Sequence, residues 1–297
     1  MRILLFGTSG QVGWELRRAL LPLGEVIAIS RQEADFNQPE SLRRCFENIN
    51  PALVVNAVAY TAVDLAESES DVAECVNAAA VAVLADEAAK WGALLIHYST
   101  DYVFDGESAK PYVESDIPNP QGAYGRSKRA GELAVEKSPG DFLILRTSWV
   151  YATRGKNFVR TMLKFAAERD QLRVVADQHG APTSARLIAD CTAQIAASAV
   201  RERAEGRFKS ALLHLTASGA TTWHGLAMRV IDAARRHDGA MVRVNNVEPI
   251  ATSQYPTPAK RPMNSRLDTT QLRERFHLHL PDWTVGVDLC LEELLQR

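Results

Sequence analysis

A tyrosine and a lysine four residues apart are the first side chains whose spacing could carry chemistry. Tyr124 and Lys128 stand in the run YGRSK, inside a segment, 123–137, whose pattern predicts a helix, and residues four apart share one helix face. A phenol with an ordinary pKa near ~10 exchanges protons poorly at neutral pH. A neighbouring ammonium favours the phenolate and is expected to lower that pKa. Taken alone, the pair also fits an amphipathic surface helix.

A hydroxyl upstream makes the catalytic interpretation stronger. Ser99, Thr100 and Asp101 follow directly after a predicted buried strand over 93–98. Ligands of open parallel sheets bind at the carboxyl ends of the strands, so Thr100 is expected at that edge. We therefore predict that Thr100, Tyr124 and Lys128 form one catalytic group.

A glycine-rich turn lies at the start of the chain. The run GTSGQVG follows the apolar residues 3–6 and opens a helical pattern, with glycines at 7, 10 and 13. Glycines allow the backbone to turn sharply and approach a pyrophosphate, and the free N–H groups of a helix start favour the anion. The spacing is GxxGxxG rather than the more familiar GxGxxG. In this strand–turn–helix context, Gly7, Gly10 and Gly13 predict a dinucleotide site.

The end of the second predicted strand bears on which dinucleotide is used. Residues 26–29 are followed by Ser30 and Arg31, where sites that prefer NAD carry an acidic residue. A hydroxyl and a guanidinium instead suit the extra phosphate of NADPH, and NADH stays possible. Glu33 nearby weighs against this preference, and Arg31 could be a solvated loop residue. Asp35 and Phe36 are candidates for contacts with the adenine.

The first half of the chain predicts the elements that must position these side chains. Continuous apolar runs alternate with helical patterns, which indicates a parallel sheet covered on both faces. The expected fold is α/β, a doubly wound, mostly parallel Rossmann-type sheet. The predicted strands are 3–6, 26–29, 53–57, 93–98 and 142–146, and the predicted helices are 14–21, 41–49, 71–91 and 123–137.

The second half is less regular and predicts a smaller C-terminal lobe for the substrate. We expect a dinucleotide-binding domain over 1–150, to which a segment near 180–217 returns, and an interleaved substrate lobe within 151–297. Helices are predicted at 158–168, 187–200, 271–276 and 285–295, and strands at 172–176, 212–216 and 241–247. The proline-rich stretch 249–262 predicts loop. Arg261 within it is a candidate partner for a diphosphate.

Composition narrows the class of protein. The 297 residues are 46% hydrophobic and 24% charged, and 34 basic residues face 36 acidic ones. A chain so close to neutral has no general attraction to nucleic acid or anionic membrane. It has no long apolar segment that predicts a membrane span or a signal peptide. The four scattered cysteines indicate reduced thiols, so a cytoplasmic location is expected. A monomer and a homodimer are both compatible with these features.

Several longer stretches give the sequence a family resemblance. These stretches, which span almost the whole chain, are LLFGTSGQVGWEL, VVNAVAYTAVDLAES, HYSTDYVFDG, YGRSKRAGE, LRTSWVY, DQHGAPTS and RPMNSRLDT. Through them the sequence resembles the extended short-chain dehydrogenases/reductases, which implies a Rossmann-type fold and a nicotinamide cofactor. The activity implied is NADPH-dependent reduction of the C4 keto group of dTDP-4-dehydro-L-rhamnose to dTDP-L-rhamnose, in the synthesis of cell-surface polysaccharide.

The resemblance also implies roles for individual residues. Tyr124 is the expected proton donor, Lys128 its partner and a contact of the nicotinamide ribose, and Thr100 a hydrogen-bond partner of the reacting oxygen. Gly10, Gln11 and Val12 are expected to hold the pyrophosphate, and Ala59, Tyr60 and Thr61 to line the cofactor. The residues expected to face the sugar nucleotide are Val63, Asp64, Thr100, Asp101 and Trp149. Trp149 also fits plain core packing.

Other functions on the same fold remain open. One is a non-catalytic NADP-binding regulatory subunit, of the kind that acts on methionine adenosyltransferase. Another is a different nucleotide-sugar reductase, an epimerase or a dehydratase, although dehydratases of this type usually carry Asp-Glu beside the catalytic hydroxyl. Some relatives bind magnesium through an acidic residue equivalent to Glu15. Arg186 stands where a second acid is expected, and a guanidinium does not bind Mg²⁺, so no metal is predicted.

Overall fold

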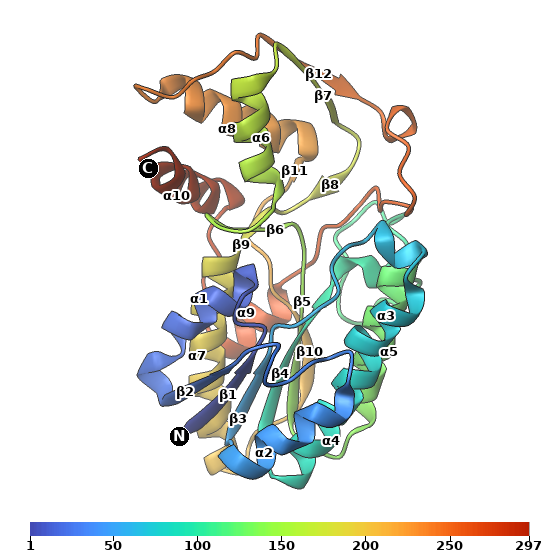
Figure 1. Ribbon diagram of the computed structural model, residues 1–297, viewed down its shortest axis with the longest axis vertical. Coiled ribbons are helices and arrows are strands. Elements are labelled where there is room, and N and C mark those ends of the chain that lie inside the picture. The colour runs from blue at the N-terminus through green and yellow to red at the C-terminus, as the bar shows by residue number, and fades with distance from the viewer. Residues whose placement is uncertain (297) are drawn as a thin grey trace.

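The computed structural model describes residues 1–296, and a six-stranded parallel sheet lies at its centre (Figure 1). The strands are short and almost wholly apolar, as expected when helices cover both faces. The α/β doubly wound fold predicted from the sequence is confirmed. Across the sheet the order is β2 (Glu25–Ile29), β1 (Arg2–Phe6), β3 (Leu53–Asn56), β4 (Leu94–Thr100), β5 (Phe142–Thr147) and β10 (Ala211–His214).

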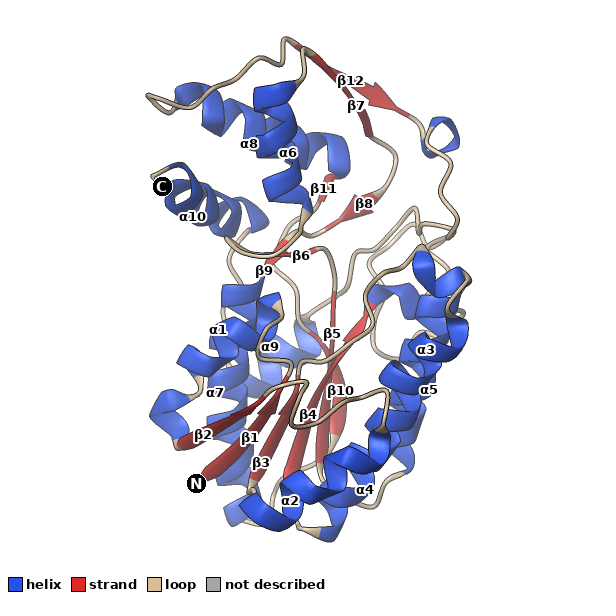
Figure 2. Ribbon diagram, viewed as in Figure 1, coloured by secondary structure: helices blue, strands red, loops and turns tan. Residues whose placement is uncertain are grey.

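Helices cover both faces of the sheet (Figure 2), and alternate residues of each strand enter two separate cores. On β1, Ile3 and Leu5 face one side of the sheet, and Leu4 and Phe6 face the other. The first side is covered by α1 (Gln11–Ala19), α7 (Ala185–Ala204) and α9 (Thr270–Phe276). The second side is covered by α2 (Arg43–Ile49), α4 (Ala80–Lys90) and α5 (Ala123–Lys137). The helices following β1 and β3 therefore lie on opposite faces, which opens a crevice at the carboxyl ends of these two strands.

A second lobe has its own apolar core (Figure 1). Three helices form most of it: α6 (Phe158–Glu168), α8 (Trp223–Arg236) and α10 (Trp283–Leu295). They pack with the parallel pair β7 (Gln171–Val175) and β12 (Asn246–Ile250). Two further pairs lie where the chain passes between the lobes: β6 (Val150–Tyr151) with β9 (Thr183–Ser184), and β8 (His179–Gly180) with β11 (Thr221–Thr222). Short 3₁₀ turns occupy Leu21–Leu23, Pro39–Leu42, Leu65–Glu67, Asp101–Val103 and Thr252–Gln254.

Besides the two-residue strands, which the sequence did not predict, three longer elements differ from the sequence prediction. The predicted strand 241–247 is wrong in position, because β12 begins at Asn246 and continues through Pro249. A proline is tolerated there because β12 pairs with one neighbour only. Helix α8 was not predicted. The predicted helix 71–91 is α3 (Ser70–Glu74), a π-helical turn (Cys75–Ala79) and α4. Among residues 1–296, none of the helices combines the length and apolar character needed to cross a bilayer.

Candidate active site

The glycine turn between β1 and α1 is shaped by contacts that exclude side chains. Gly7 has φ +83°, and a Cβ atom there would lie 2.5 Å from the carbonyl carbon of Ala57 after β3. A Cβ atom on Gly13 would lie 2.1 Å from the Gly7 carbonyl oxygen. Gly10 precedes the first turn of α1, whose N–H groups have no partners within the helix. The turn therefore offers bare backbone to an anion at the sheet edge.

A cavity of about 660 Å³ extends from this turn across the ends of β1, β2 and β3. Most of the residues predicted to bind the cofactor line it, and these are Gly7, Gly10, Ser30, Arg31, Asp35, Phe36, Ala59 and Tyr60. The structure does not bring the others to its wall. Val12 packs into the core beneath α1, the Gln11 side-chain oxygen accepts a hydrogen bond from Asn157 at 2.8 Å, and Thr61 is exposed.

Arg31 stands at the rim of this cavity with most of its side chain in solvent. Its guanidinium lies 3.5 Å from the Asp35 carboxylate. The neighbouring Ser30 N–H donates to Glu33 at 2.8 Å, which holds the pKa of that carboxyl below its ordinary value. A phosphate bound here would meet one cation and two nearby carboxylates. The preference for NADPH predicted from Ser30 and Arg31 therefore depends on whether the bound phosphate attracts the Arg31 guanidinium more strongly than the Asp35 carboxylate does.

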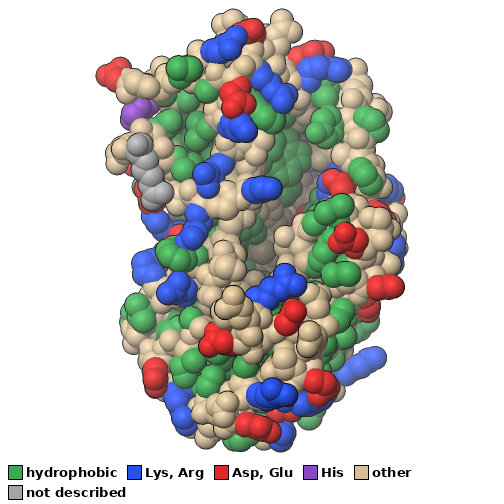
Figure 3. All heavy atoms as spheres, in the orientation of Figure 1, with side chains coloured by type: hydrophobic (Ala, Val, Ile, Leu, Met, Phe, Trp, Pro, Cys, Tyr) green, Lys and Arg blue, Asp and Glu red, His purple; other side chains and the backbone are tan. Residues whose placement is uncertain are grey.

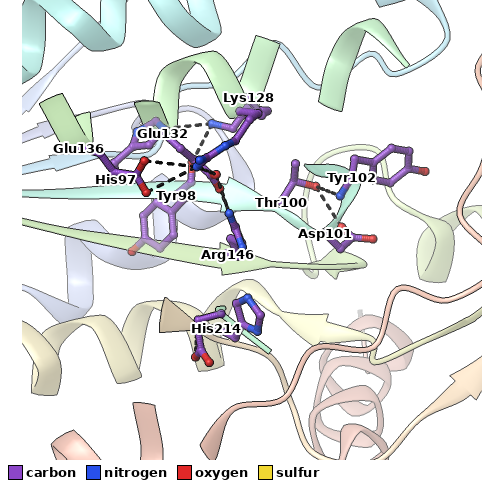
Figure 4. Close-up of polar contacts among 12 residues, drawn as sticks. His97, Tyr98, Thr100, Asp101, Tyr102, Lys128, Glu132, Glu136, Arg146 and His214 are labelled. Carbon is purple, nitrogen blue, oxygen red and sulfur yellow. Dashed lines mark hydrogen bonds and ion pairs between the residues drawn. The ribbon is translucent and has the colours of Figure 1, made fainter. Parts of the chain in front are cut away.

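Thr100 and Tyr124 meet at the other end of the cofactor crevice. Thr100 is the last residue of β4, and its Oγ1 atom accepts from the Tyr102 N–H at 3.2 Å and donates to Asp101 Oδ1 at 3.0 Å (Figure 4). The Tyr124 phenol lies close to the same hydroxyl. The structure thus brings together Thr100, Asp101 and Tyr124.

The pKa of Tyr124 is raised, whereas the sequence analysis predicted that it is lowered. Burial raises this pKa above its ordinary value, while the nearby Thr100 hydroxyl lowers it by less. The Lys128 Nζ atom instead donates to the Tyr98 carbonyl oxygen at 2.7 Å and lies 3.3 Å from His97 Nε2 (Figure 4). The expectation that Lys128 lowers the Tyr124 pKa is therefore wrong for the free protein, because its nitrogen is engaged beneath the strand.

Asp101 is the charged group closest to this hydroxyl. Asp101 is 4% exposed, and burial raises the pKa of its carboxyl to about 6, although the nearby Ser265 and Thr100 hydroxyls act to lower it. Its second carboxylate oxygen has no hydrogen-bond partner. A buried acceptor without a partner is costly in a folded protein. Asp101 thus lies at the sheet edge where a ligand hydroxyl could satisfy it.

A second cavity, of about 750 Å³, lies on the other side of Tyr124, toward the helical lobe. Figure 3 shows the surface hollowed between the two lobes. Aromatic and basic side chains dominate its wall: Tyr102, Phe158, Phe165, Trp223, Tyr255, Arg169, Arg173 and Arg261. The Tyr102 ring packs edge-on against Tyr124, with centroids 5.5 Å apart. Tyr60, on the wall of the first cavity, also packs beside Tyr124. Tyr124 therefore stands between the two cavities.

Arg261 ties the proline-rich loop to this edge. Its guanidinium lies 2.6 Å from Asp64 and 3.2 Å from the Tyr102 hydroxyl. Of the residues predicted to face the sugar nucleotide, Asp64 lines the second cavity, and Val63 packs beside Tyr124. The sequence marked Arg261 as a candidate, but its pairing across almost 200 positions could not be predicted from local pattern.

Trp149 lines neither of these two cavities, although the sequence analysis predicted that it faces the sugar nucleotide. It has the left-handed φ of +48°, where the chain leaves β5. Its ring stacks on Trp223 of α8, with centroids 3.5 Å apart and an interplanar angle of 7°. Trp223 is the member of this pair on the cavity wall, and the sequence prediction missed it together with α8. Its neighbours Leu226, Val230 and Ala234 follow a helical apolar spacing that could have identified the helix.

Asn77 is a second residue that the prediction left out. It lies in the π-helical turn between α3 and α4 and is fully buried. Its amide accepts from the Tyr60 N–H at 2.9 Å, and donates to the Tyr60 carbonyl at 3.1 Å and the Ser127 hydroxyl at 3.0 Å. Asn77 thereby fixes the cofactor-lining segment against α5. Such turns in a helix frequently mark functional sites.

The acidic residue considered for magnesium is paired with a guanidinium. Arg186 Nε lies 3.6 Å from Glu15, and Arg186 also pairs with Glu293. Within the described chain, 1–296, no cluster of three or more His, Cys, Asp or Glu side chains is arranged to hold a metal ion. The donor set around Glu15 thus contains a cation that cannot act as a ligand. Independence from magnesium stays a prediction.

Fold and site together define a class of protein: a Rossmann-type, dinucleotide-binding oxidoreductase with a tyrosine and a hydroxyl at the sheet edge. Comparison with known proteins narrows this class. The family described as the RmlD substrate binding domain matches residues 1–296, and the chain belongs to this family.

Relatives and solved structures agree with that assignment over the full chain. A dTDP-4-dehydrorhamnose reductase of Burkholderia thailandensis is 52% identical, covering 100% of both chains. The crystal structure of a dTDP-4-dehydrorhamnose reductase from Clostridium acetobutylicum has a TM-score of 0.89 at 34% identity, also covering 100% of both chains. That of the Bacillus anthracis reductase, in complex with NADP, has a TM-score of 0.86 at 31% identity, covering 98% of this chain and 99% of that one.

Proposed function

We propose that the protein reduces the C4 keto group of dTDP-4-dehydro-L-rhamnose with NADPH, giving dTDP-L-rhamnose. The relatives carry the name of this activity, and one solved relative holds NADP. The observation that carries the proposal is the position of Tyr124, close to Thr100 and between the cavity at the glycine turn and the cavity lined by aromatic rings and arginines. A proton donor is needed where the two substrates of a reduction meet.

The first cavity fits the cofactor. We assign the pyrophosphate to the bare turn at Gly7, Gly10 and Gly13 and the start of α1, with Gln11 and Val12 contributing backbone N–H groups. Ser30 and Arg31 would take the phosphate of the adenosine ribose, and Asp35 and Phe36 would border the adenine. Ala59, Tyr60 and Thr61 would continue toward the nicotinamide. When bound, NADPH supplies the hydride for the carbonyl carbon.

The residues at the sheet edge supply the proton and stabilise the developing charge. Tyr124 donates its phenolic proton to the carbonyl oxygen as negative charge grows there. Thr100 turns its proton from Asp101 toward the same oxygen and shares a hydrogen bond with it. Lys128, on the helix face of Tyr124, holds the nicotinamide ribose. The buried surroundings strengthen each of these interactions, because little water competes.

The second cavity fits the nucleotide sugar. Its aromatic rings suit a base, and its arginines suit a diphosphate, which guanidinium groups bind through paired hydrogen bonds. Asp64 and Asp101, at the end facing Tyr124, would accept hydrogen bonds from sugar hydroxyls, with Val63 beside them. We assign Trp149 a supporting role behind Trp223.

The test is a direct assay with the pure protein. dTDP-4-dehydrorhamnose and NADPH should be consumed together, followed by the loss of reduced-nicotinamide absorbance and by identification of the product. Consumption only with a different keto sugar would replace the substrate. NADPH binding without turnover of any nucleotide sugar would favour a regulatory subunit. Epimerisation without net oxidation of NADPH would place the protein among the epimerases.

We also propose a cytoplasmic location and a monomeric or homodimeric state. All four cysteines are free thiols in the structure, as expected in a reducing compartment. A net charge of −2 gives no general attraction to nucleic acid. Light scattering during gel filtration would distinguish one copy from two.

A further inference from the structure

Beneath the catalytic edge, a row of buried polar groups leads to Lys128, and its other members have no part in the reaction described above. It runs from Asn56 at the end of β3, through His97 in the middle of β4, to Lys128 on α5 (Figure 4 shows His97 and Lys128). Asn56 and His97 are fully buried, and Lys128 is 1% exposed. Asn56 Nδ2 lies 3.1 Å from His97 Nδ1, and His97 Nε2 lies 3.3 Å from Lys128 Nζ.

The contact at Asn56 determines the direction of each hydrogen bond between Asn56 and Lys128. The Val58 N–H, in the cofactor-lining segment, donates to Asn56 Oδ1 at 3.0 Å. This contact fixes the amide, so its Nδ2 donors point at His97. His97 Nδ1 must then accept, and a neutral imidazole with an accepting Nδ1 carries its proton on Nε2.

That proton faces Lys128 Nζ, and this contact distinguishes the two forms of the lysine. An ammonium has three donors and no acceptor, whereas an amine keeps a lone pair. Nζ already donates to the Tyr98 carbonyl oxygen. An ammonium would therefore set two donors against each other at His97. Reversing the ring and the amide together would only move the clash to Val58, because Nδ2 would then face its N–H.

We propose that Asn56 and His97 are positioning residues that act on the proton state of Lys128, favouring its amine form over the ammonium in the free protein. They link it through Val58 to the segment that lines the cofactor cavity. This inference rests on the proposed function only for its kinetic readout.

Burial acts on Lys128 in the same direction as this arrangement. It lowers the pKa of Lys128 to about 8, although Glu132, one turn further along α5, acts to raise it. Both Glu132 oxygens are engaged by Arg146 of β5 at 2.7 Å, and one also by Arg129. Burial holds the pKa of His97 well below its ordinary value, so His97 stays neutral. Tyr124, one turn earlier on α5, is an uncharged phenol because burial raises its pKa.

The tautomer of His97 can be measured without substrate. Nitrogen NMR of the imidazole rings in the full-length protein distinguishes a protonated Nε2 from a protonated Nδ1, and His97→Gln identifies the signal. We expect the proton on Nε2 in the wild type near neutral pH. A proton on Nδ1 would overturn the proposal. This result stands whether or not the protein reduces a keto sugar, so the failure of one idea can be told from the failure of the other.

Asn56→Asp should reverse the hydrogen-bond directions from residue 56 through His97 to Lys128. A carboxylate only accepts, so it would take hydrogen bonds from Val58 and from a proton on His97 Nδ1, which turns Nε2 into an acceptor for an ammonium. We expect the tautomer to change. The ammonium form of Lys128 should then persist to higher pH. We therefore expect the fall of kcat/KM at high pH to move upward by at least about one pH unit, which corresponds to a tenfold rise in the proton affinity of Lys128. An unchanged tautomer with an unchanged pH profile would refute the coupling.

Asn77→Asp is the matched control for added charge. Asn77 is equally buried and holds the same cofactor-lining segment, but it bonds to Tyr60 and Ser127 rather than to His97. Its replacement adds one buried negative charge beside the same cofactor-lining segment and should leave the His97 proton on Nε2. If Asn77→Asp changed the tautomer as Asn56→Asp does, charge alone would explain the effect and the proposal would fail. If Asn56→Asp does not fold, the wild-type tautomer decides.

Discussion

Replacing Asp101 by Asn should stabilise the folded protein more at high pH than at low pH. Asp101 is buried beside Thr100, and burial raises its pKa to about 6. The folded state therefore holds the Asp101 proton more tightly than the unfolded chain does. The carboxyl group thus contributes most favourably at low pH, and this contribution is lost as pH rises from the unfolded value near ~3.9 through the folded value.

The magnitude follows from the two pKa values. A carboxyl with an ordinary pKa of 3.8 that is raised to about 6 on folding destabilises the protein at high pH by about 3 kcal/mol. Roughly 1 kcal/mol of this is already present at about pH 4.5, where most unfolded chains have ionised. Asparagine does not titrate, so the Asn variant should gain about 2 kcal/mol relative to wild type between about pH 4.5 and pH 8.

Urea unfolding of both proteins at a series of pH values measures this difference directly. Any constant cost of placing an amide at position 101 cancels, because only the change with pH is compared. Asp86→Asn, at an exposed position on α4, is the matched control and should show little change with pH. A stability difference between Asp101→Asn and wild type that is the same at both ends of the range would refute the reasoning.

Three further predictions concern the reaction. Tyr124→Phe removes only the phenolic oxygen and should lower kcat by roughly 10²–10⁴-fold with cofactor binding nearly intact, measured by turnover and by NADPH titration; turnover near the wild-type rate would show that another group donates the proton. Arg31→Ala should raise the KM for NADPH by about 10- to 150-fold, the worth of a charged hydrogen bond, and leave NADH nearly unaffected; equal losses with both cofactors would contradict the assignment. Activity should survive EDTA followed by gel filtration, because Arg186 occupies the acidic pair Glu15 and Glu293; loss of activity that Mg²⁺ restores would contradict this.

The sheet was predictable because strands that are buried on both faces consist largely of apolar residues, which can be recognised in the sequence. Residues 3–6 and 53–55 are apolar throughout, as expected of strands that are buried on both faces, and the glycine turn follows the first of them directly. The Tyr124–Lys128 spacing and the hydroxyl after β4 were equally local. Parallel pairing then brings such local signals to one edge, which is why the candidate site could be largely proposed from sequence.

The remaining features depend on contacts that sequence pattern does not contain. Lys128 was expected to act on the phenol, but its nitrogen bonds to His97 and the Tyr98 carbonyl, which lie on another element. The pairing of Arg261 with Asp64 joins distant segments. Strand β12 was misplaced because Pro249 reads as a loop signal unless the edge position of the strand is known. Helix α8, by contrast, has apolar residues at helical spacing, so its sequence does contain the signal for a helix.

The way residues 185–214 complete the sheet has a consequence for synthesis on the ribosome. Helix α7 buries Ile188, Ile195 and Ala199 against one sheet face, and β10 pairs with the edge of β5. A nascent chain ending near residue 150 therefore has one face of its five strands partly bare and one long edge unpaired. Such intermediates are prone to aggregation. Cotranslational folding of this sheet must wait until β10 has left the exit tunnel, and a fragment cut after β5 is expected to be insoluble.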